Sequence, residues 1–158
     1  MSPPAFSPEE LADRAAIQDV ITLYCNAVDR RDFDGVASCF TDDATAVYGG
    51  VTIEPGGDGV VRFLKQLRPL DGDRHVGTHL LGNLLITLRG DEADAESYVI
   101  AYSVPADPAA PVRMRGLRYR DRLVRLPAGW KIAGRVHSAD WEGGVPNIPV
   151  TPIQPQAR

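Results

Sequence analysis

The chain has 158 residues, of which 44% are hydrophobic and 24% charged, a balance typical of a soluble globular protein with one full core. Its formal charge of −4 argues against nucleic-acid binding, because that function needs a basic face. Two cysteines are too few for a disulfide scaffold, and no apolar run approaches the ~20 residues that cross a bilayer, so a membrane protein is not expected.

The N-terminal segment from Met1 to Phe6 lacks the basic and apolar parts of a signal peptide. We therefore expect a cytoplasmic protein in which Cys25 and Cys39 are reduced, small buried residues.

The first predicted element is a helix that starts near residue 8 and ends near residue 30. Ser7 can cap it, Pro8 suits the first helical position, and Glu10 completes a capping box with Ser7. Asp29 lies near the C-terminus of this helix, where a carboxylate opposes the helix dipole, a misfit compatible with a functional role. The apolar stripe comprises Ile17, Val20, Ile21, Tyr24, Ala27 and Val28.

Two shorter helices and one short strand are predicted next. A second helix follows Asp32 and extends through Phe40, and residues 44–48 form a strand that ends at Gly49. A third helix begins near Gly56 and stops before Pro69. The Gly56 region lacks the spacing of a phosphate-binding loop.

Four long strands follow, over residues 75–88, 92–104, 112–126 and 130–141, and their short connections predict antiparallel pairing. Strict alternation places His79 and Asn83 on one face of the first of these strands. Both of its faces are largely apolar, so we expect burial on both sides. The arginines between residues 113 and 125 alternate with apolar residues, which favours one solvated strand face over an anion site.

Helices followed by strands predict an α+β fold: a cone of three N-terminal helices against a curved, mostly antiparallel sheet. We expect one domain over residues 1–142. The tail over residues 143–158 is rich in proline and should form an extended arm or a disordered end.

Three stretches of the chain resemble the SnoaL-like branch of the nuclear transport factor 2-like superfamily. The first is Leu11-Ala-Asp-Arg-Ala-Ala-Ile-Gln-Asp-Val20 with Tyr24 and the Asp29-x-x-Asp-Phe-Asp turn. The second is Thr78-His-Leu-Leu-Gly-Asn83, and the third runs from Tyr119-x-Asp-x-Leu to Gly129-Trp-Lys-Ile. The resemblance spans about residues 9–141.

The resemblance is greatest to the scytalone dehydratases, bile-acid 7α-dehydratases and hexachlorocyclohexane dehydrochlorinases of that superfamily. It implies a lyase without cofactor or metal, in which Asp29 holds and polarises His79 as the general base. It also implies a small hydrophobic cyclic substrate and a homodimer or homotrimer formed through the outer face of the sheet. Residues expected to line the pocket are Tyr24, Tyr48, Asn83, Tyr102, Arg118, Tyr119 and Trp141.

Several alternatives remain open from the sequence. The general acid could be Tyr48, Tyr102, Tyr119 or Arg118, and His137 fits the pocket and the surface equally well. A polyketide cyclase or isomerase with the same base is the second hypothesis for the activity. A non-catalytic small-molecule-binding or assembly module is the third, because fold alone does not fix function.

Overall fold

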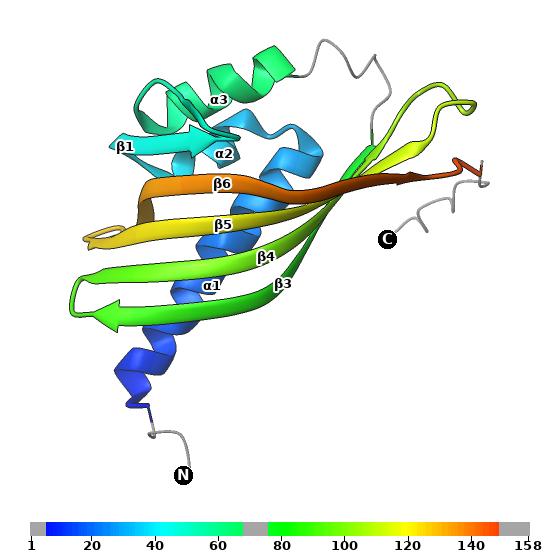
Figure 1. Cartoon of the computed structure of the whole chain (residues 1–158). Coiled ribbons are helices and arrows are strands. Elements are labelled where there is room, and N and C mark those ends of the chain that lie inside the picture. Colours follow the sequence, from blue (N-terminus) through cyan, green and yellow to red (C-terminus); the bar gives the residue numbers. More distant parts are fainter. Residues whose placement is uncertain (1–5, 68–75, 149–158) are drawn as a thin grey trace, which may run out of the picture.

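A computed structural model describes residues 6–67 and 76–148 of the chain. The helices are α1 (Pro8–Arg30), α2 (Phe33–Ser38) and α3 (Gly56–Leu67). The strands are β1 (Phe40–Tyr48), β2 (Val51–Thr52), β3 (Val76–Arg89), β4 (Glu92–Val104), β5 (Val112–Leu126) and β6 (Gly129–Val145). The predicted α+β architecture is confirmed: the helices pack against one curved, unclosed sheet (Figure 1).

The sheet has six strands in the order β2-β1-β6-β5-β4-β3. The pairs β3–β4, β4–β5 and β5–β6 are antiparallel as expected, whereas β1 pairs with β6 in parallel. Helix α1 crosses one face of the sheet, and α2 and α3 gather at the end near β1 (Figure 1). Within the described residues no helix is long and apolar enough to cross a membrane.

The start of α1 follows the sequence prediction closely. Ser7 accepts a hydrogen bond from the Glu10 backbone N–H at 3.1 Å, and the Glu10 carboxylate accepts one from the Ser7 backbone N–H at 2.7 Å. The helix ends at Arg30 and is capped by Arg31, whose φ of 57° is left-handed. Both ends of α1 are therefore fixed locally, and Asp29 occupies a defined place in its last turn.

The boundary between α2 and β1 corrects one expectation. Phe40 was predicted in a helix, but it opens β1 and pairs with Ile132 of β6. Its ring lies edge-on to Tyr24 with centroids 5.7 Å apart, and only 1% of its surface is exposed. This packing outweighs the local helical pattern. Cys39 caps α2, and both it and Cys25 are free and buried.

Strand β3 corrects a second expectation, because its outer face is exposed. Leu80 and Leu85 keep 60% and 70% of their surface accessible, so the strand is not buried on both sides. The register with β4 shifts between Leu81 and Leu84. That bulge reverses the alternation, so that Leu84 and Ile86 pack on the core while Asn83 is exposed.

Candidate functional site

Asp29 and His79 meet where the end of α1 passes the start of β3. The Nδ1 atom of His79 lies 2.6 Å from Oδ1 of Asp29, and the backbone N–H of His79 donates to Oδ2 at 2.8 Å. Their side chains are 12% and 19% exposed, respectively. With Nδ1 facing the carboxylate, Nδ1 carries the proton and Nε2 presents a lone pair, the arrangement of a general base. The carboxylate fixes both the position and the tautomer of the ring.

A cavity of about 530 Å³ lies beside this pair, between α1, α3 and the concave face of the sheet. Its volume falls in the range that holds a drug-sized molecule. The apolar part of its wall comes from α1, β2, α3 and β5. It includes Val28, Val51, Phe63, Leu64, Leu67 and Leu117.

The polar side chains of the cavity belong to cross-strand rows on the concave face. One row runs from Tyr48 through His137 to Tyr119, and the rings of Tyr48 and His137 stack with centroids 4.9 Å apart. A second row, nearer the opening, runs from His79 through Ala101 to Arg115 and on to Glu142. Residues two apart along a strand share a face, and cross-strand pairing brings residues of five strands, β1 and β3 to β6, to the concave face.

The two phenols at the deep end form a hydrogen-bonded pair. The hydroxyl oxygens of Tyr24 and Tyr48 are 2.9 Å apart. Burial raises the pKa of both hydroxyls, although the positive charge of Arg135 opposes the rise. Both phenols are therefore protonated at neutral pH. One hydroxyl donates to the other, and the second can donate a hydrogen bond to a bound molecule.

Arg135 lies behind these phenols and is paired with Asp121. Two hydrogen bonds of 2.7 Å join the guanidinium to both carboxylate oxygens, and both side chains are 0% exposed. Its guanidinium carbon also lies 4.1 Å from the ring centroid of Tyr24 and 4.3 Å from that of Tyr119. Burial is the largest single effect on the guanidinium and lowers its pKa. The charge and hydrogen bonds of Asp121, together with Tyr48 and Tyr24, outweigh burial, so the pKa is raised.

His137 is a cavity residue that the sequence left undecided. Burial lowers its pKa to about 4, and the positive charges of Arg135 and Arg115 act in the same direction. Its Nδ1 atom is buried and makes no hydrogen bond within residues 6–67 and 76–148. His137 is therefore neutral at pH 7. His137 and Ala139 are two apart on β6 and therefore share a face, which was the signal available in the sequence. The sequence could not show whether that face points into the cavity.

The structure places the expected lining residues in two groups. Tyr24, Tyr48, Tyr102 and Tyr119 line the cavity together with His79. The expectation was wrong for the other three residues. Arg118 and Trp141 lie on the outer face of the sheet, and Asn83 lies at an exposed bulge of β3.

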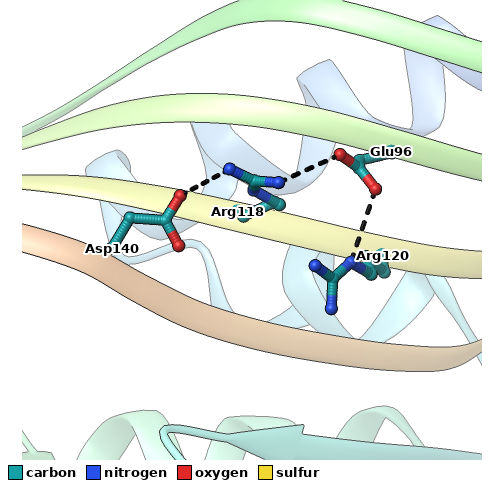
Figure 2. Close-up of polar contacts among 4 residues, drawn as sticks. All are labelled: Glu96, Arg118, Arg120 and Asp140. Atoms are coloured by element: carbon teal, nitrogen blue, oxygen red, sulfur yellow. Dashed lines mark hydrogen bonds and ion pairs between the residues drawn. The ribbon is translucent and has the colours of Figure 1, made fainter.

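Arg118 points away from the cavity because it alternates with Leu117 and Tyr119. It forms ion pairs of 2.8 Å with Asp140 and 3.4 Å with Glu96, and Figure 2 shows these contacts over the outside of the sheet, continued by Arg120. Trp141 is 47% exposed and covers Gly116, where a Cβ atom would come within 2.1 Å of its indole nitrogen. Trp141 and Ala139 are two apart on β6, but a register shift opposite Gly116 and Leu117 lies between them, so they do not share a face.

Comparison with known proteins gives this geometry a family context. A model of the SnoaL-like domain matches residues 9–136. The uncharacterized protein Rv2910c of Mycobacterium tuberculosis is 35% identical over 136 residues, covering 84% of this chain and 88% of its own length.

Solved structures give the same picture. A protein of Novosphingobium aromaticivorans, provisionally named an aromatic ring hydroxylase, is 31% identical with a TM-score of 0.72, covering 85% of this chain and 94% of its own. Hexachlorocyclohexane dehydrochlorinase LinA-type3 of Novosphingobium barchaimii shares the fold at 22% identity and a TM-score of 0.77, covering 90% of this chain and 97% of its own. On these matches the chain belongs to the SnoaL-like domain family.

Proposed function

We propose that this protein is a lyase that removes a proton from carbon and expels a leaving group from the adjacent carbon of a small hydrophobic cyclic substrate. The observation that carries the proposal is the contact of 2.6 Å between Asp29 and His79 at the wall of an apolar cavity. A protein provisionally named a scytalone dehydratase and a hexachlorocyclohexane dehydrochlorinase, both among the structural neighbours, support elimination as the class of reaction.

In the proposed step, Nε2 of His79 takes the proton, and the electron pair of the broken C–H bond forms a carbon–carbon double bond. The bond from the neighbouring carbon to the leaving group breaks at the same time or afterwards. A leaving hydroxide takes a proton from the Tyr24–Tyr48 pair and departs as water, and the proton on His79 then passes back to the phenolate. A halide departs as an anion, and His79 releases its proton to solvent. Asp29 stabilises the imidazolium that forms, because it already accepts the hydrogen bond from Nδ1.

The test uses two probes that report elimination directly. Loss of water from 3-hydroxy-1-tetralone gives a product that tautomerises to fluorescent 1-naphthol, and γ-hexachlorocyclohexane releases chloride. We expect turnover of at least one probe by the wild type. His79→Gln should lower the rate ~10²–10⁴-fold, the usual cost of removing a general base.

Asn83→Ala is the matched control, because Asn83 lies on the same strand but is exposed at the bulge. It should leave the rate unchanged. Deuterium incorporation into 3-hydroxy-1-tetralone without loss of water would favour the isomerase or cyclase alternative. Tight binding of both probes with neither exchange nor elimination would favour the binding module, and equal rates for the wild type and His79→Gln would overturn the assigned base.

A further inference from the structure

The feature that the proposed elimination does not use is a cation on the cavity wall, Arg115. It is half-buried, lines the cavity, and occupies the same cross-strand row as His79. Only Ala101 separates the two along this row. Two strand spacings place their backbones roughly 10 Å apart.

The neighbouring charges leave Arg115 available for a ligand. Its cross-strand partner Glu142 accepts two hydrogen bonds from Arg113, at 2.6 and 3.2 Å. Among the described residues, Arg115 makes no ion pair or side-chain hydrogen bond of its own. Elsewhere in the cavity, Arg135 neutralises the charge of Asp121. Asp29 keeps its negative charge beside the neutral His79, but both of its oxygens already accept hydrogen bonds from His79.

The arginines of β5 divide between the two faces of the sheet, and this corrects the expectation of one solvated face. Arg118 and Arg120 lie outside, where carboxylates neutralise them (Figure 2). Arg113 and Arg115 lie on the cavity side. Glu142 lies beside Arg115 on the cavity wall and interacts with its charge, but its hydrogen bonds go to Arg113. The guanidinium donors of Arg115 therefore remain available to a ligand with a negative group.

We propose that Arg115 binds a carboxylate of the substrate, so that the natural ligand is an apolar ring that carries an anionic group some distance from the carbon that reacts at His79. A guanidinium can hold both carboxylate oxygens at once, which fixes the orientation of the ring in the cavity. This inference shares its cavity with the proposed function, but it concerns binding and can be tested without turnover.

The experiment measures dissociation constants by calorimetry for 2-naphthoate, for the neutral isostere 2-naphthamide and for acetate. We expect naphthoate to bind more tightly than both, because it alone offers ring and charge together. Arg115→Gln should weaken naphthoate binding roughly 10- to 100-fold, the range of a charge-assisted hydrogen bond, while leaving naphthamide nearly unchanged. Arg115→Lys should restore part of the loss.

Arg120→Gln, on the outer face of the same strand, is the control and should leave both affinities unchanged. Circular dichroism confirms that each variant is folded, and the comparison of naphthoate with naphthamide in the wild type needs no variant. Equal affinity for naphthoate and naphthamide, no detectable binding of either at millimolar concentration, or an equal loss in Arg120→Gln would overturn the inference. His79→Gln should retain the preference for naphthoate, so a failure of the elimination step is distinguishable from a failure of the anion site.

Discussion

Replacing Asp121 by Asn tests how the deep end of the cavity is held together. The substitution keeps the shape of the side chain but leaves Arg135 as an unpaired cation with 0% side-chain exposure. Removing one partner of a buried ion pair costs about 3–5 kcal/mol. Tyr24 and Tyr119 still face the guanidinium at 4.1 and 4.3 Å, so we expect a value near the lower limit.

A loss of about 3 kcal/mol is a large part of the 5–15 kcal/mol typical of a folded domain. At about 2–4 °C per kcal/mol for a chain of this size, Tm should fall by roughly 6–12 °C. Urea unfolding at pH 7, followed by circular dichroism, gives the free energy of unfolding, and a thermal scan gives Tm. The measurement should be made for Asp121→Asn, for Arg135→Met and for the double variant.

The double variant removes both charges of the buried pair, so its loss should be smaller than the combined losses of the single variants by about 2 kcal/mol or more. Additive losses would show that the two side chains do not act as a pair. A loss below about 1 kcal/mol for Asp121→Asn would refute the reasoning outright, because it would mean that water or a rearranged neighbour already solvates Arg135.

Three further outcomes follow. Asp29→Asn should lower elimination about 10²-fold or more with the fold intact by circular dichroism, because an amide does not stabilise the imidazolium as a carboxylate does. Burial and nearby cations lower the pKa of His137 to about 4 in the folded protein. As pH falls from 6.5 to 4 the unfolded chain binds a proton at this residue before the folded protein does, so the free energy of unfolding should drop by roughly 3 kcal/mol over that window. Urea unfolding measured across this pH range should show a shallower slope for His137→Phe. Gly57→Ala should destabilise the fold by about 1–3 kcal/mol, because a Cβ atom there would lie 2.4 Å from the Ala37 carbonyl oxygen, whereas Gly143→Ala, with nothing within 4 Å, should be nearly neutral in the same unfolding assay.

The sequence predicted the elements of this fold because their signals are local. The capping box at Ser7, the alternation in β4 and β5, and the turns between the long strands are each contained within a few residues. The position of Asp29 on α1 and of His79 near the start of β3 follows from the same signals. Their contact itself came from the family resemblance, since nothing local joins residues on different elements.

The errors arose where pairing between strands decides the outcome. Alternation assigns a face only as far as the next bulge, and the bulges next to Asn83 and before Trp141 depend on how β3 pairs with β4 and β5 with β6. For Arg115 and His137 the alternation along the strand was visible in the sequence. Which of the two faces points into the cavity was not, because that depends on where the helices pack. The homodimer or homotrimer stays a prediction, to which exposed Leu80 and Leu85 add a patch of apolar surface.

The parallel pairing of β1 with β6 has a consequence for the order in which the protein is built on the ribosome. Tyr48 is synthesised long before His137, yet the two rings stack and their strands lie side by side in the sheet. Until β6 emerges, the long edge of β1 has no partner there, and the cavity lacks part of its floor. Ligand binding should therefore be absent from stalled nascent chains that expose residues only up to about 128, and should appear once the last strand has left the exit tunnel.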